Sequence, residues 1–138
     1  MTDDVELWQR TLAVEHAVIW SYGLVGATSG LDEPAEAALS VHRSRRTDCI
    51  EAIVDLGGEP VASAPSYDVD KPPSTSAARQ LATDLEDSAS AAYASLAGAA
   101  DRRSRLRAAQ WLRVSAIMQT QWSGRVPALP GLETDPAS

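Results

Sequence analysis

The sequence of 138 residues contains no phenylalanine and only 5% aromatic residues, and Cys49 is its single cysteine. One cysteine excludes an internal disulfide and a thiolate zinc cluster. The chain also has no run of 18 apolar residues and no basic, apolar leader at its start. These absences lead us to expect a cytoplasmic chain that neither enters a membrane nor is exported.

Positively charged residues are fewer than negatively charged ones, which gives a formal net charge of −7. Nucleic-acid affinity comes mostly from clustered Lys and Arg, so nucleic acid is not an expected partner. The exceptions are two arginine-rich stretches, HRSRR at 42–46 and RRSRLR at 102–107. They leave open a weaker alternative, an adaptor that binds an acidic partner through these patches.

The residues that are abundant favour helices. The composition is 44% apolar and rich in alanine, which suits close packing of helices over a sheet-based core. Apolar residues recur at steps of three and four in four stretches. We therefore predict an all-α chain with helices at about 4–26, 34–56, 74–98 and 102–122.

The segment between the second and third helices is long and holds four prolines, GEPVASAPSYDVDKPPS at 58–74. A helix of 24 residues is ~36 Å long, whereas 17 extended residues span up to ~56 Å. This loop can therefore travel the length of the bundle and place the third helix parallel to the second. That crossover predicts a ferritin-like four-helix bundle over residues 1–125, followed by a Pro/Gly-rich tail at 126–138.

Several polar residues fall at a similar depth in these helices. Counting inward from the helix ends predicts a buried polar core layer formed by Glu15, His16, His42, Arg46, Glu86 and Arg113, with Gln110 adjoining it. A buried carboxylate needs either a cation or a metal ion as its partner. The preferred interpretation pairs Arg46 and Arg113 with the two glutamates, because guanidinium groups close such a layer without a cofactor.

The alternative is a reduced metal site of Glu15, His42 and Glu86 for iron, manganese or zinc. A complete di-iron bundle also requires a Glu-x-x-His pair on each of two helices. The stretch from 102 to 122 has neither acid nor histidine, and Gln110 and Arg113 stand there instead. The sequence therefore argues against a di-iron oxidase.

Four segments together resemble a small actinobacterial ferritin-like domain family of unknown function, DUF4439. They are LAVEHAVIWSYGLVGA at 12–27, VHRSRRTDCIEAIVDLGGEP at 41–60, LATDLEDSASAAYASL at 81–96 and QWSGRVPALPGL at 121–132. The resemblance implies a ferritin-like four-helix fold and no activity. We accordingly expect a non-enzymatic protein without a cofactor, in the form of a homodimer, whose polar layer is structural or lines a small ligand pocket.

Overall fold

The chain forms four helices in the computed structural model, which describes residues 4–124. They are α1 (Asp4–Gly26), α2 (Asp32–Asp55), α3 (Thr75–Leu96) and α4 (Arg102–Ser123). The all-α prediction is confirmed, with helix ends within about two residues of those expected. The predicted tail at 126–138 lies outside the described residues.

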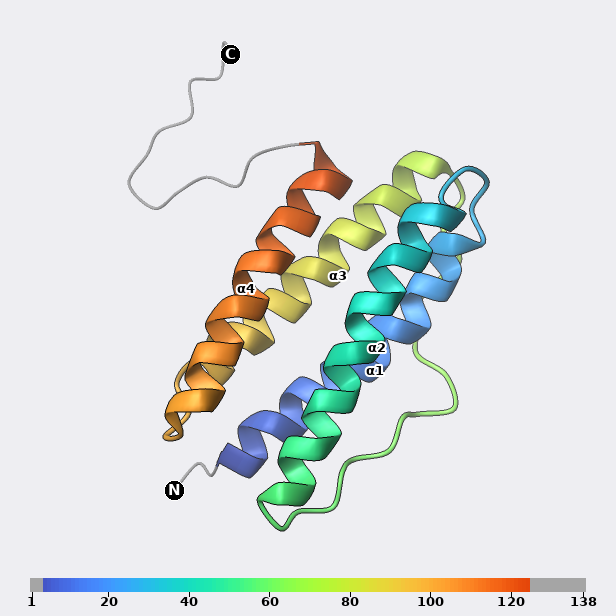
Figure 1. Cartoon of the computed structure of the whole chain (residues 1–138). Coiled ribbons are helices and arrows are strands. Elements are labelled where there is room, and N and C mark those ends of the chain that lie inside the picture. The colour runs from blue at the N-terminus through green and yellow to red at the C-terminus, as the bar shows by residue number, and fades with distance from the viewer. Residues whose placement is uncertain (1–3, 125–138) are drawn as a thin grey trace.

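The directions of the four helices confirm the predicted crossover between α2 and α3. In Figure 1, α2 and α3 run in the same direction and α1 and α4 run in the opposite one. The loop between α2 and α3 therefore has to return along the bundle, which is the connectivity of ferritin-like folds. Close helix packing joins α1 to α2, α3 to α4, and α1 to α3.

The crossover loop is fastened to α1 by side chains. Gln9 donates to the carbonyl oxygen of Glu59 at 2.6 Å and accepts from the backbone N–H of Val61 at 2.8 Å. Farther along α1, Trp20 contacts Tyr67, with ring centroids 5.9 Å apart. The Gln9 side chain thus satisfies two backbone groups of an extended, proline-containing loop that forms no secondary structure, and it holds that loop against α1.

The helix ends follow the local sequence. Ser74 caps α3 by accepting from the backbone N–H of Ala77, and Asp101 caps α4 by accepting from that of Ser104. Gly124 ends α4 with φ at 70°, a left-handed conformation that glycine adopts without strain.

Two apolar clusters fill the ends of the bundle. One gathers Tyr22, Val25 and Trp122, and the other gathers Trp8, Leu12 and Trp111, each with several buried alanines or small residues. Cys49 is buried in the second cluster, where burial raises the pKa of its thiol. Within residues 4–124, no helix is long and apolar enough to cross a membrane.

Candidate functional site

A chain of three fully buried side chains lies between the two apolar clusters. It consists of Glu15 on α1, His42 on α2 and Glu86 on α3, each with 0% of its surface exposed. The Nδ1 atom of His42 lies 2.7 Å from Glu15 Oε2, and its Nε2 atom lies 2.8 Å from Glu86 Oε2. An imidazolium donates from both ring nitrogens and an ionised carboxylate accepts, so this geometry suits a protonated His42 between two carboxylates.

Two tyrosines donate hydrogen bonds to these carboxylates in a reciprocal pattern. Tyr22 of α1 donates to Glu86 of α3, and Tyr93 of α3 donates to Glu15 of α1. In both helices the tyrosine follows its glutamate by seven residues, so both side chains occupy one face two turns apart. Since α1 and α3 run in opposite directions, each tyrosine reaches the carboxylate of the other helix.

Arg45 supplies a second positive charge from α2. Its side chain is 4% exposed, and its Nη1 atom donates to the Tyr93 hydroxyl at 2.9 Å and to Ser115 Oγ at 3.0 Å. Ser115 of α4 in turn donates to Glu86 Oε1 at 3.1 Å. Arg45 therefore reaches both carboxylates through hydroxyl groups and touches neither directly.

The formal charges of this set add to zero, because Glu15 and Glu86 are balanced by His42 and Arg45. These four residues, with Tyr22, Tyr93 and Ser115, are called the mid-bundle network below. Every carboxylate in it accepts from an imidazole and from a hydroxyl group. Such complete pairing is the condition under which charges persist in an apolar interior.

Burial and pairing act in opposite directions on these groups. Burial by itself lowers the pKa of His42, but the hydrogen bonds to Glu15 and Glu86 outweigh it and raise the pKa to about 9. Burial raises the pKa of Glu86, yet the hydrogen bond and charge of His42 leave that pKa below its ordinary value. Burial, followed by the adjacent carboxylate charge, raises the pKa of Tyr22 and of Tyr93. At neutral pH His42 is thus charged and the tyrosines remain donors.

The structure brings Glu15, His42 and Glu86 together but corrects the predicted cations. Arg46 is only partly buried and Arg113 is exposed, as is Gln110. On α2 the inward face continues from His42 by three residues to Arg45 and not by four to Arg46, the predicted position. On α4 the inward positions are Trp111 and Ser115, which place Arg113 on the opposite side.

His16 also lies outside the network. It is adjacent to Glu15 and therefore points to another face of α1, where its Nε2 atom donates to the carbonyl oxygen of Val61 at 3.0 Å. Its Nδ1 atom is buried without a hydrogen-bond partner. His16 thus belongs to the attachment of the crossover loop.

Arg45 and Ser115 are members of the mid-bundle network that were not predicted from the sequence. The shared Glu-x₆-Tyr spacing of α1 and α3 was available as a signal for a reciprocal pair. The two missed residues had no such signal, because an Arg next to another Arg and a serine within a helix are both common on solvated faces.

The donor set does not fit a two-metal centre. Among the described residues, no group of three or more His, Cys, Asp or Glu is arranged to hold a metal ion. Both nitrogens of His42 are used by the carboxylates that would be its fellow ligands, so an ion would have to displace the imidazolium. The Arg45 guanidinium next to this position would repel a cation further.

Comparisons with known proteins agree with this architecture. The model of a domain of unknown function, DUF4439, matches residues 8–134. A crystal structure of a conserved hypothetical protein, Rv2844 of Mycobacterium tuberculosis, is similar with a TM-score of 0.83 and 31% sequence identity. That similarity covers 88% of this chain and 95% of the other. No curated protein matches the chain.

Proposed function

This chain belongs to the DUF4439 family of unknown function, and we propose that it is a non-enzymatic helical protein whose mid-bundle network joins the helices without a metal ion. One observation carries the proposal. His42 occupies the place between Glu15 and Glu86 and binds both carboxylates at 2.7 and 2.8 Å. In this interpretation the imidazolium does the work of a bridging cation.

The charge balance supports the same view. Removing one member of a buried charge pair costs about 3–5 kcal/mol, because the remaining charge is stranded. A network of two acids and two bases avoids that cost only while all four are present. The layer is then a structural element that fixes the registers of α1, α2 and α3 relative to one another.

Metal analysis of the intact protein, purified without chelator, tests the proposal. We expect no stoichiometric iron, manganese or zinc, and no rise in Tm when these ions are added to the purified protein. Glu33→Gln is the matched control, since Glu33 is exposed on α2 and lies outside the network. Stoichiometric metal that is lost in Glu15→Ala or His42→Ala but retained in Glu33→Gln would overturn the proposal and favour the alternative metal-binding protein.

The homodimer remains a proposal. Its support is that Leu106 and Ile117 on α4 are 60% and 54% exposed, and Val54 on α2 is 56% exposed, so both helices carry large apolar side chains at the surface. Sedimentation equilibrium should report twice the chain mass, and Ile117→Glu should return a monomer. A monomer at about 100 μM, well above the Kd of a stable dimer, would overturn it.

The expected location and partners also stay predictions. Cytoplasmic residence and the absence of nucleic-acid binding are supported by the composition, the single cysteine and the net charge of −7. An adaptor role through the arginine-rich stretches has less support. The two stretches lie on different helices, and Arg45, the second arginine of the first, is buried in the network.

A further inference from the structure

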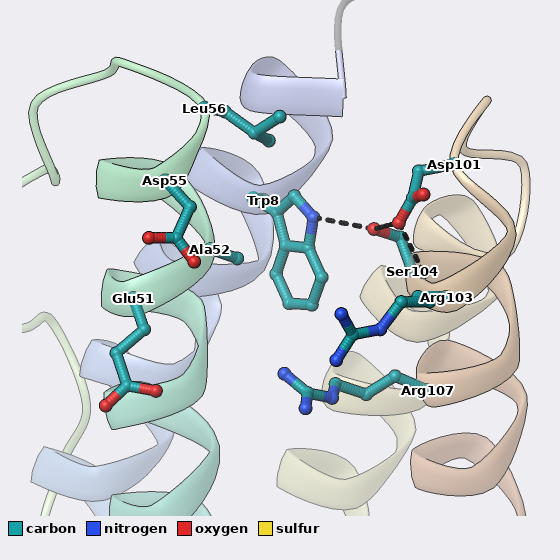
Figure 2. Close-up of a pocket in the computed structure, with 9 residues that line it drawn as sticks. All are labelled: Trp8, Glu51, Ala52, Asp55, Leu56, Asp101, Arg103, Ser104 and Arg107. Atoms are coloured by element: carbon teal, nitrogen blue, oxygen red, sulfur yellow. Dashed lines mark hydrogen bonds between the residues drawn. The ribbon is translucent and has the colours of Figure 1, made fainter.

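A pocket of about 390 Å³ opens between the last turns of α2 and the first turns of α4. This pair of helices is not among those that pack closely. Figure 2 shows the Trp8 indole ring between the two helices, with Ser104 next to it on α4. The Trp8 Nε1 atom donates to Ser104 Oγ at 3.2 Å, so the position of the ring in the pocket is fixed.

The two walls of this pocket carry opposite charges. Arg103 and Arg107 extend from α4 toward α2, and Glu51 and Asp55 stand on α2 (Figure 2). These four residues, with Trp8, are called the charged pocket. Within residues 4–124, no ion pair or side-chain hydrogen bond is formed by any of the four, although Arg43 and Glu36 on the surface of α2 do pair at 3.3 Å.

One further acid lines the pocket but is already engaged. Asp101 accepts from the backbone N–H and the hydroxyl group of Ser104, both at 2.9 Å. Its role as the α4 cap explains its position, and these bonds lower its pKa. The Asp101 carboxylate offsets the partial positive charge of the α4 N-terminus and also interacts with the charge of Arg103, so this wall attracts an anion through the guanidinium groups of Arg103 and Arg107 alone.

A molecule that fits must satisfy both walls at once. A plain anion would meet the arginines but lie opposite two carboxylates, and a plain cation would meet the reverse. A molecule with one carboxylate and one ammonium group matches both. We infer that the charged pocket binds a small zwitterion of the amino acid or dipeptide class, with its carboxylate at Arg103 and Arg107 and its ammonium group at Glu51 and Asp55.

The Trp8 indole N–H provides a local reporter for the test. The full ¹⁵N-labelled chain is titrated with a set of glycyl dipeptides whose second residue is apolar, polar or charged, and the signal is assigned with Trp8→Phe. We expect at least one dipeptide to shift this signal saturably. Its N-acetylated and C-amidated forms should each bind at least about tenfold more weakly, because each loses one of the two charges.

Paired variants separate the two walls. Arg103→Gln with Arg107→Gln, and Glu51→Gln with Asp55→Asn, should each weaken the dipeptide at least about tenfold. The acid variant should leave the already weak N-acetylated form unchanged, because that form has no ammonium group to lose. The matched control is Arg102→Gln with Glu33→Gln, two exposed sites outside the pocket, and it should bind as the natural sequence does.

Three results would overturn the inference. The first is the absence of a saturable shift with every dipeptide up to about 20 mM, which is weaker than any useful affinity. The second is equal binding by the natural chain and both wall variants. The third is binding of inorganic phosphate that depends on the arginines while the dipeptides fail, since that describes an anion site only.

Discussion

The mid-bundle network and the charged pocket each contain two acids and two bases, but they use them in opposite ways. In the network the groups are buried and every carboxylate is in hydrogen-bond contact, with His42 held at 2.7 and 2.8 Å from its partners. In the pocket the acids and bases stand on separate helices with open space between them. The comparison shows that burial requires charges to be paired, whereas charges at the surface can pair, as Arg43 and Glu36 do, or stay apart.

The physical reason is the cost of desolvation. An unpaired charge in an apolar interior costs several kcal/mol, so a buried set is stable only when closed. At the surface, water solvates each charge, and an ion pair contributes at most about 1 kcal/mol. The pocket can therefore leave its charges apart at little cost, which is what allows a ligand to bind between them.

The largest effect is expected when two neighbouring arginines of α2, one inside the network and one outside it, are mutated separately. Arg45→Met should lower the free energy of unfolding by ~3–5 kcal/mol, because it strands net negative charge in the network. Arg46→Met should change it by less than ~0.5 kcal/mol, since Arg46 is partly exposed and has no network contact. Urea denaturation of both variants measures the difference, and equal effects would mean that Arg45 does not balance the carboxylates.

The pH dependence of stability tests the protonation of His42. Its pKa rises from 6.5 in the unfolded chain to about 9 in the fold, so its contribution is complete below pH 6.5 and is lost as the pH rises through about 9. The expected loss is about 3 kcal/mol. Glu86, whose pKa is lowered, contributes above its ordinary value of 4.5 and loses that contribution at lower pH.

Denaturation at a series of pH values should therefore show greatest stability between about pH 4.5 and 6.5. The control is His42→Gln, in which the decline between pH 6.5 and 9 should largely disappear. A decline of the same size in that variant would assign the effect to other groups.

The reciprocal tyrosines test whether the two halves of the network depend on each other. Tyr22→Phe and Tyr93→Phe should each cost ~1.5–3 kcal/mol, because each removes a hydrogen bond to a buried carboxylate. Because His42 links Glu15 to Glu86, we expect the double variant to differ from the sum of the single ones. Strict additivity in a double-mutant cycle would show that the two halves act independently.

The smallest effect is expected in the charged pocket. Arg107→Gln should alter the free energy of unfolding by less than ~0.5 kcal/mol, because its guanidinium group has no partner to lose. The urea denaturation used for Arg45→Met measures this change on the same scale. A cost near that of Arg45→Met would reveal a structural role for the pocket and weaken the case for a binding site.

Much of the architecture was predictable from the sequence. The proline-rich loop and the helix lengths gave the crossover, and counting from the helix ends placed Glu15, His42 and Glu86 at one level. The choice between Arg45 and Arg46 was not predictable from one helix, because steps of three and four from His42 both stay close to the same face. That choice is made by Tyr93 and Ser115, which come from α3 and α4.

Arg113 was misplaced for a related reason. Its depth along α4 was right, but depth says nothing about direction around the helix, and Trp111 and Ser115 take the inward positions. The charged pocket was not predicted at all. Its arginines were seen only as part of a basic stretch, and the acids that face them belong to a helix about 50 positions earlier in the sequence.

The loop fastened to α1 divides the molecule into two hairpins, α1 with α2 and α3 with α4, that meet mainly along α1 and α3. Because the crossed tyrosine–glutamate bonds join the hairpins and the loop is attached chiefly to the first of them, a protease cut near Ser66 would sever the chain without removing the bonds between the halves. Two fragments made separately are therefore expected to recombine into the intact bundle, which makes this fold a candidate for split-protein complementation.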